Sequence, residues 1–190
     1  LLLHHFSKHN HFLVCAVALS YCMGPHIDLH HGRKTVNTSP TPQTDTANSP
    51  LRLPVYEALA KDIQNLGIEA VFGLVSDDTA MFTTALDSIG IRFYGARHEN
   101  SAITMAEGYA SASGRLGVAV VGRGPATANG MHAAVYTSRT GSPVLIVYGE
   151  APVGGEALNA IGPDYKEFNS VGVLSAAGIQ VFRATSSGGA

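Results

Sequence analysis

The 190-residue chain has little charge, few cysteines and no long hydrophobic run. Charged residues make up only 14% of it and the net charge is −2, so nothing points to a nucleic acid or an acidic membrane as partner. A surface so poor in charge indicates that another domain or subunit covers part of it. Both cysteines, Cys15 and Cys22, lie near the N-terminus, which excludes a disulfide framework or cysteine metal site in the rest. The apolar run at 12–23 has 12 residues, well short of the ~20 that a membrane-spanning helix needs.

Several well-known enzyme motifs are also missing. The sequence has neither a G-x-x-x-x-G-K-[ST] phosphate loop nor a G-x-S-x-G nucleophile elbow. Gly122-x-Gly124 half-matches a dinucleotide-binding fingerprint, with Glu150 as a candidate for the ribose-binding acid. However, Thr127 stands at the third glycine position, Pro125 removes one amide, and Glu150 is farther along than the usual ~20 residues. These absences argue against an NTPase, an α/β-hydrolase and a dinucleotide enzyme.

The first 52 residues differ in composition from the rest. Residues 1–34 hold seven of the nine histidines, and three interpretations compete: a targeting leader, a histidine metal tract, or a translated leader with no role in the fold. We favour the third, because the composition changes sharply afterwards. Residues 35–52 are rich in Thr, Ser and Pro and predict a disordered linker. The body fits a cytoplasmic protein, while the leader leaves organelle or secretory targeting open.

Residues 53–184 alternate short apolar runs with helical patterns. Such alternation predicts an α/β fold, a three-layer parallel sheet with helices on both faces, followed by a flexible tail or linker at 185–190. The expected strands are 69–75, 91–96, 117–122, 142–150 and 179–184; the expected helices are 54–67, 76–87, 99–114, 125–139 and 165–178. Asp77 and Asp78 are expected to cap the second of these helices.

Ligands of such sheets bind at the carboxyl ends of the strands. This rule gathers residues 74–78, 96–100, 122–129 and 148–152 at one edge. Taken alone, Glu99 is a first-turn carboxylate that complements a helix dipole for a few tenths of a kcal/mol. Behind it, alanines at 102, 106 and 110 form a smooth helix face that permits close approach of another element.

In combination, these motifs resemble a known family. Arg97-His98-Glu99, Ala106-x-Gly108-Tyr109-Ala110 and the Gly124-Pro125 loop closing at Asn129 are similar to the pyrimidine-binding (PYR) domain of thiamine-diphosphate enzymes of the acetolactate synthase, benzoylformate decarboxylase and pyruvate oxidase group. The resemblance covers roughly residues 53–183. It implies a flavodoxin-like, doubly wound PYR domain, and it implies that the alanine face packs against a second subunit.

The resemblance assigns roles to individual residues. Glu99 would be catalytic: it would hydrogen-bond the cofactor's aminopyrimidine ring and share a proton with it, so that the exocyclic nitrogen acts as a base. The cofactor-binding residues implied are Glu99, Val75, Ser76, Gly124, Pro125 and Asn129, with no metal ligand. One departure is Ala126, where the family has a second glycine; a positive φ there would strain alanine.

The family's pyrophosphate-binding domain, with its Gly-Asp-Gly magnesium motif, is not in this sequence. The expected partner is therefore such a domain of the same or another subunit, in a homo-oligomer (dimer or tetramer), with Mg²⁺ held only by that domain and a flavin (FAD) left open. We expect the chain to be the PYR half of an acetolactate synthase-like transferase or lyase acting on 2-keto acids, inactive alone. The alternatives are the separate PYR subunit of a two-chain 2-keto acid decarboxylase and a non-catalytic binding module.

Overall fold

The computed structural model describes residues 14–20, 53–150 and 166–184. The predicted linker at 35–52, the tail at 185–190 and the histidines of the leader lie outside these ranges. The described strands are β1 (Val14–Ser20), β2 (Ala70–Gly73), β3 (Arg92–Gly95), β4 (Gly117–Val121), β5 (Val144–Glu150) and β6 (Gln180–Ala184). The described helices are α2 (Val55–Asn65), α3 (Ala80–Ser88), α4 (Glu99–Ser113), α5 (Pro125–Thr140) and α6 (Ser170–Ala176).

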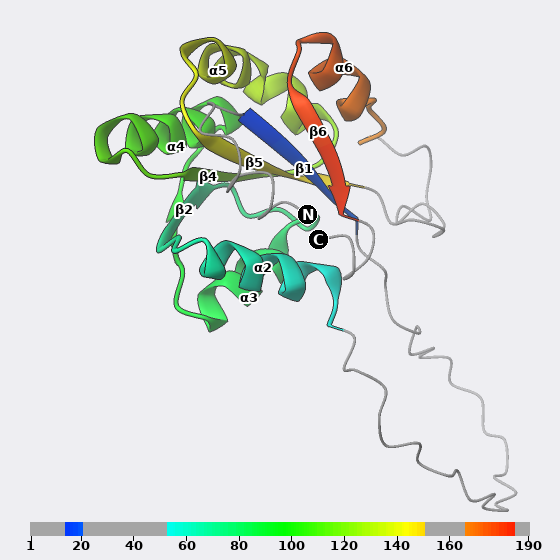
Figure 1. The fold of residues 1–190 in the computed structure, drawn as a ribbon. Coiled ribbons are helices and arrows are strands. Elements are labelled where there is room, and N and C mark those ends of the chain that lie inside the picture. Colours follow the sequence, from blue (N-terminus) through cyan, green and yellow to red (C-terminus); the bar gives the residue numbers. More distant parts are fainter. Residues whose placement is uncertain (1–13, 21–52, 151–165, 185–190) are drawn as a thin grey trace, which may run out of the picture.

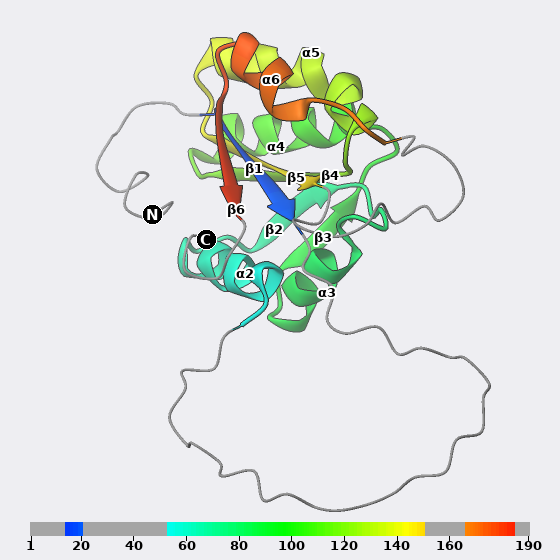
Figure 2. The same ribbon diagram turned by 90° about the vertical axis from the view of Figure 1, so that its right-hand side faces the viewer.

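All six described strands run parallel in one sheet, in the order β3-β2-β4-β5-β1-β6 (Figures 1 and 2). From β2 onward each strand is followed by a helix, except the last, because a parallel connection needs a crossover. Without β1 the order is β3-β2-β4-β5-β6, which is the flavodoxin-like 2-1-3-4-5 order of a doubly wound sheet. The predicted fold class is confirmed.

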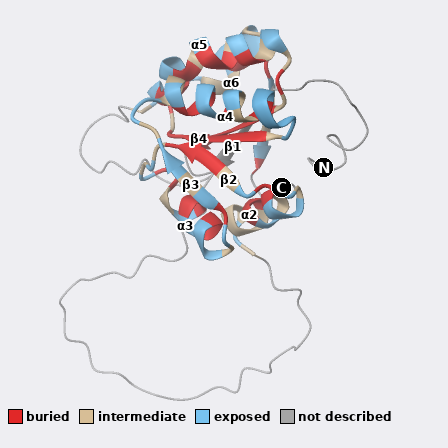
Figure 3. Cartoon of the chain, turned by 90° about the vertical axis from the view of Figure 1, so that its left-hand side faces the viewer, coloured by how far each residue is buried: buried red, intermediate tan, exposed pale blue. Residues whose placement is uncertain are grey.

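Helices cover both faces of this sheet. Helices α2 and α3 lie on one face, and α4, α5 and α6 lie on the other (Figures 1 and 2). Residues of β4 alternate between two apolar cores: Val118 and Val120 pack on the α2/α3 side, while Ala119 and Val121 pack on the α4–α6 side. Because successive side chains point to opposite faces and both faces are covered, the strand is apolar throughout and buried between the layers (Figure 3).

The alanine face of α4 packs against the chain's own sheet. Ala102, Ala106 and Ala110 are buried within the chain, in the same core as Ala119 and Val121. The approach is close, since a Cβ added to Gly117 would lie 2.1 Å from the backbone oxygen of Ala106. The expectation of close packing is therefore confirmed, but the interpretation as a second-subunit surface is wrong.

The first strand comes from the leader. Residues 14–20 form β1, which pairs in parallel with β5 on one side and β6 on the other. The interpretation that the leader has no role in the fold is thus wrong for this segment. A short apolar run followed by polar sequence is as typical of a targeting element as of a strand, so this strand could not be predicted from the sequence. None of the helices in the described ranges combines the length and the hydropathy needed to cross a bilayer.

Candidate functional site

The carboxyl ends of β2, β3 and β4 carry most of the predicted site residues. Val75 and Ser76 follow β2, Glu99 begins the helix that follows β3, and Gly124 and Pro125 follow β4. Parallel strands bring these loops to one edge of the sheet, as the sequence predicted.

Glu99 and Asn129 are in contact. Glu99 lies in the first turn of α4, and the Asn129 side chain on α5 donates a hydrogen bond from Nδ2 to Glu99 Oε2 at 3.2 Å. His98 caps α4, its Nδ1 accepting from the Asn100 amide at 3.1 Å. Among the described residues Glu99 Oε1 makes no hydrogen bond. Two residues 30 positions apart thus form one polar pair.

The two helices approach closely enough for this contact because α5 has a glycine at the crossing. A Cβ on Gly130 would lie 2.7 Å from Ile103 Cδ1 and 3.6 Å from the Glu99 Cβ. A second bond ties the helices together, since the Asn100 side-chain oxygen accepts from the Ala133 amide at 2.9 Å. The position of Glu99 is therefore set by packed helices rather than by a loop.

The turn before α5 is built from glycine and proline. Gly124 has φ +64°, and a Cβ on it would meet the Lys166 backbone oxygen at 2.1 Å. Pro125 is the first residue of α5, where its fixed φ suits a helix start. Ala126 lies inside the helix and is buried, and no non-glycine residue of the described ranges has positive φ. The departure from the family's second glycine therefore carries no backbone strain.

The loop after β2 lies beside this turn. A Cβ on Gly122 would come within 3.2 Å of Ser76 Oγ, so Ser76 packs against the turn that precedes α5. The Ser76 hydroxyl also pairs with Thr79 Oγ1 at 3.2 Å. Val75, on the same loop, is 64% exposed. The structure thus brings Ser76 to the glycine turn and leaves Val75 facing outward.

A charged cluster on this edge was missed by the sequence reading. The expectation that Asp77 and Asp78 cap α3 is wrong, since the N-cap of α3 is Thr79. Asp78 instead belongs to this cluster. Its buried carboxylate, only 4% exposed, accepts from Arg123 Nε at 3.2 Å and from Lys166 Nζ at 2.8 Å. Lys166 also pairs with the exposed Asp77. The signal available in the sequence was an acid and an arginine directly after two neighbouring strands, but Lys166 lies 88 residues from Asp78.

The cluster shifts the pKa values of Asp77 and Lys166. Hydrogen bonding to Lys166 lowers the pKa of Asp77, against a smaller opposing effect of burial. Burial alone would lower the pKa of Lys166, but its hydrogen bonds to Asp77 and Asp78 raise it overall. Glycine also makes room here, since a Cβ on Gly149 would lie 2.7 Å from the Asp78 Cβ. The cluster links the loops after β2 and β4 to the segment that leads into α6.

Glu150, the weak candidate for a ribose-binding acid, is engaged elsewhere. It ends β5 and accepts from Arg183 of β6, with Nη2 to Oε1 at 2.7 Å and Nε to both carboxylate oxygens at 3.0 and 3.1 Å. This bidentate pair gives Glu150 a structural partner.

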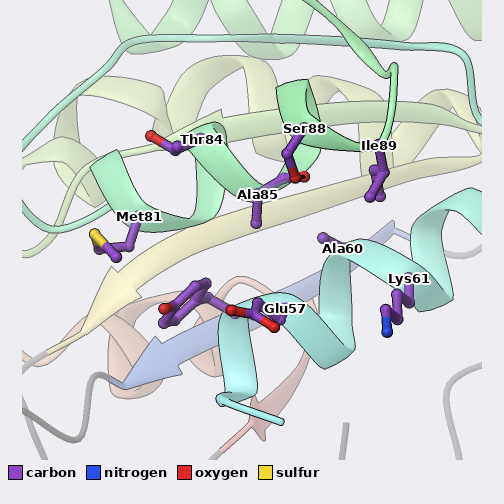
Figure 4. A pocket seen from close by; sticks show the side chains of 9 residues that line it. Glu57, Ala60, Lys61, Met81, Thr84, Ala85, Ser88 and Ile89 are labelled. Atoms are coloured by element: carbon purple, nitrogen blue, oxygen red, sulfur yellow. Dashed lines mark hydrogen bonds between the residues drawn. The ribbon is translucent and has the colours of Figure 1, made fainter. Parts of the chain in front are cut away.

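A surface hollow of about 350 Å³ lies away from this edge, between α2 and α3 (Figure 4). Its walls come from Tyr56, Glu57, Ala60, Lys61, Met81, Thr84, Ala85, Ser88 and Ile89. None of the predicted site residues lines it, so it is not the predicted site. No group of three or more His, Cys, Asp or Glu in the described part of the chain could hold a metal ion.

Comparisons with known proteins show to which family the chain is related. Sulfoacetaldehyde acetyltransferase from Rhodobacter capsulatus is 31% identical over 101 residues, covering 53% of this chain and 17% of the relative. 2-Hydroxyacyl-CoA lyase 2 from Danio rerio is 34% identical over 95 residues, or 50% of this chain and 15% of the relative. Acetolactate synthase large subunit from Lactococcus lactis is 31% identical over 122 residues, or 63% of this chain and 20% of the relative. The matched segment thus spans a fifth or less of each relative.

A family model described as "Thiamine pyrophosphate enzyme, N-terminal TPP binding domain" matches residues 54–170. That range is more than half of the chain, and it contains Glu99, Asn129 and the Gly124–Pro125 turn. The chain therefore belongs to the thiamine pyrophosphate enzymes and carries their N-terminal TPP binding domain.

Proposed function

We propose that this chain is the pyrimidine-binding half of an acetolactate synthase-like enzyme acting on 2-keto acids, with Glu99 as its catalytic carboxylate. The observation that carries the proposal is the Glu99–Asn129 pair, held at the starts of two packed helices on the carboxyl edge of the sheet. A carboxylate that only complemented a helix dipole would need no such partner from a second helix.

The residues present fit the pyrimidine end of thiamine diphosphate. An aminopyrimidine ring needs a carboxyl group that can exchange a proton with a ring nitrogen. Glu99 offers Oε1, while Asn129 fixes the carboxylate through Oε2. Gly130 and Gly124 allow neighbouring segments to pack closely, since a Cβ on Gly130 would lie 2.7 Å from Ile103 Cδ1 and one on Gly124 would lie 2.1 Å from the Lys166 backbone oxygen. The edge therefore combines a carboxylate oriented by Asn129 with tightly packed backbone that holds it in place.

When bound, thiamine diphosphate supplies a carbon nucleophile that adds to the keto carbon of the substrate. This chain's part is to hold the ring and to move one proton at Glu99. Asn129 acts as a positioning residue, since its amide fixes the orientation in which the carboxylate meets the ring. We assign Ser76, Gly124 and Pro125, which lie on the neighbouring loops of the same edge, to the wall of this site, and the exposed Val75 to its rim.

The pyrophosphate end needs ligands from elsewhere. The described residues offer no metal-binding group, and the relatives are about five or more times as long as the matched segment. We therefore propose that a pyrophosphate- and Mg²⁺-binding domain, of the same or another subunit, completes the site within a homo-oligomer. A flavin forms no part of the proposal.

The test is to mix the full chain with the part of the Lactococcus acetolactate synthase that follows its matched segment, expressed separately. Assembly is followed by size-exclusion chromatography, and cofactor affinity by calorimetry with thiamine diphosphate and Mg²⁺. Proton transfer is read by NMR as deuterium exchange at the thiazolium carbon of the cofactor. Glu99→Gln should slow this exchange roughly 10²–10⁴-fold, the usual contribution of a general acid or base.

The matched control is Glu57→Gln. Glu57 is also a first-turn carboxylate, but it belongs to α2 and lines the hollow away from the site. Its replacement should leave the exchange rate unchanged. If Glu99→Gln exchanges as fast as the wild type in an assembled, cofactor-bound complex, Glu99 is not catalytic and the chain is a binding module of this fold.

A further inference from the structure

The start of α5 has no cap of its own. Its N-cap is Gly124, which makes no side-chain cap bond, and its first residue is Pro125, which has no backbone N–H. The fully buried side chains of the helix are also small: Ala126, Thr127, Gly130, Ala133, Ala134 and Thr137. Small side chains form shallow ridges, so they do little to stop a helix from sliding along its axis. The position of α5 therefore depends in large part on what holds the turn before it.

One buried carboxylate holds this turn from two sides. Arg123 directly precedes Gly124, and its Nε donates to Asp78 Oδ1 at 3.2 Å. Lys166 donates from Nζ to Asp78 Oδ2 at 2.8 Å, and its backbone oxygen packs against Gly124, where an added Cβ would be only 2.1 Å away. We call Asp78, Arg123 and Lys166 the turn clamp. The clamp thus joins the residue before the turn to the residue that packs against it.

The turn clamp is buried, unlike the contact beside it. Its three side chains are at most 16% exposed, whereas Asp77, which also pairs with Lys166, is 71% exposed. Gly149 of β5 makes the burial possible, since a Cβ there would lie 2.7 Å from the Asp78 Cβ. Stability alone does not require such a cluster, because well-packed apolar residues of similar volume are often as stable or more so. A buried network of charged hydrogen bonds does hold its groups in one geometry, which favours a role in positioning.

The start of α5 sets the position of Asn129. Asn129 lies four residues after Pro125, about 6 Å along the helix. Its hydrogen bond to Glu99, at 3.2 Å, is at the long end of the usual range of about 2.7–3.2 Å, so a small shift of α5 breaks it. One turn further along α5, the bond from the Ala133 amide to the Asn100 side chain is shorter, at 2.9 Å. The bond at Glu99 is therefore the more sensitive of the two to a displaced turn.

We propose that Asp78 is a positioning residue for the reaction: through the turn clamp it fixes the start of α5, and with it the Asn129 amide that orients the Glu99 carboxylate. The effect of Asp78 on catalysis rests on the proposed function, in which Glu99 exchanges a proton with the cofactor ring. The effect of Asp78 on the Glu99–Asn129 bond does not, and it is measured in this chain without cofactor or partner.

The test is NMR of the full chain labelled with ¹⁵N, which reads the Asn129 side-chain amide directly. Its signals are identified by their loss in Asn129→Asp, and Glu99→Ala gives the chemical shift of the amide without its bond. Measured well below the Tm of each variant, Asp78→Asn should move the Asn129 signal at least half of the way to that reference. A role in stability alone would lower the Tm and leave the signal in place.

The matched control is Asp77→Asn, which also removes a carboxylate from Lys166, but at an exposed position. It should leave the Asn129 signal unchanged. Lys166→Met is a second variant in case Asp78→Asn does not fold: it removes one cation of the turn clamp, leaves Asp78 paired with Arg123, and should move the signal in the same direction. An unchanged signal in the folded variant, an equal movement in Asp77→Asn, or failure of both variants to fold overturns the proposal.

Catalysis is read in the assembled, cofactor-saturated complex as deuterium exchange at the thiazolium carbon. Asp78→Asn should slow this exchange by up to ~10²-fold, the loss that a misplacement of about 1 Å can cause. The same change in an Asn129→Ala background should slow it no further, because Asp78 acts through Asn129, whereas independent effects would multiply. If Glu99→Gln leaves the rate unchanged, the proposed function fails; if Glu99→Gln slows the exchange and Asp78→Asn does not, only the role of Asp78 is refuted.

Discussion

Replacing Asp78 by asparagine should destabilise the chain far more than the same change at its neighbour Asp77. The two carboxylates both contact Lys166, yet their surroundings differ. Asp78 is 4% exposed and faces Arg123 as well, whereas Asp77 is 71% exposed. Asparagine keeps the shape of the side chain, so the comparison isolates the charge.

The magnitude follows from the burial of the partners. The Arg123 side chain is 10% exposed and that of Lys166 is 16%, so neither cation recovers full hydration when Asp78 loses its charge. Removing one member of a buried ion pair costs about 3–5 kcal/mol, and the residual exposure places the expected loss near the lower end, at about 3 kcal/mol. An exposed pair is worth about 0–1 kcal/mol, which bounds the effect at Asp77.

The assay is chemical denaturation of both variants beside the wild type, with thermal melts as a second measurement. A loss of about 3 kcal/mol corresponds to a drop in Tm of about 6–12 °C for a chain of this size, against at most ~4 °C for Asp77→Asn. Equal losses in the two variants would refute the reasoning, because they would show that burial of the Asp78 cluster does not govern its energy.

Three further predictions concern stability. Among the described residues the buried Tyr148 hydroxyl has no hydrogen-bond partner, so Tyr148→Phe should leave the free energy of unfolding unchanged or raise it by up to ~1 kcal/mol; a loss of more than ~1 kcal/mol would reveal a partner. Gly124→Ala adds a Cβ at a residue with φ +64°, 2.1 Å from the Lys166 backbone oxygen, and should lower the free energy of unfolding by at least ~1–3 kcal/mol. Gly108→Ala, where the added Cβ on α4 meets open space, should raise it by up to ~1 kcal/mol. The Asp77–Lys166 pair should stabilise the fold between about pH 4 and pH 10. The pKa of Asp77 is lowered, so its contribution to stability is lost as pH falls through the pKa that Asp77 has in the folded chain. The pKa of Lys166 is raised, so its contribution to stability is lost as pH rises through the pKa that Lys166 has in the folded chain. The difference in unfolding free energy between wild type and Asp77→Asn, small throughout, should vanish at both extremes, and a difference independent of pH would contradict this.

The sequence by itself determined most of the elements, their buried faces and the edge of the sheet on which the candidate site lies. The expected helix ends at Gly67, Asp87 and Gly114 rest on local signals, and each lies within two residues of the observed end of α2, α3 or α4. Parallel topology then followed from the alternation of strands and helices, and with it the meeting of Glu99 and Asn129 on one edge. These inferences succeed because hydrophobic periodicity and turn chemistry act over a few residues.

Only the tertiary structure decided which residues are partners across the chain. Asp78 looked like a helix cap because that alternative is local, whereas its actual partner Lys166 comes from 88 residues away. Residues 14–20 looked like part of a leader, yet they form an interior strand between β5 and β6. Such pairings depend on where the folded sheet places its strand ends and edges, which no window of sequence contains. These pairings form because a buried carboxylate or strand edge must have its hydrogen-bonding groups satisfied, and the folded chain offers a partner only at that place.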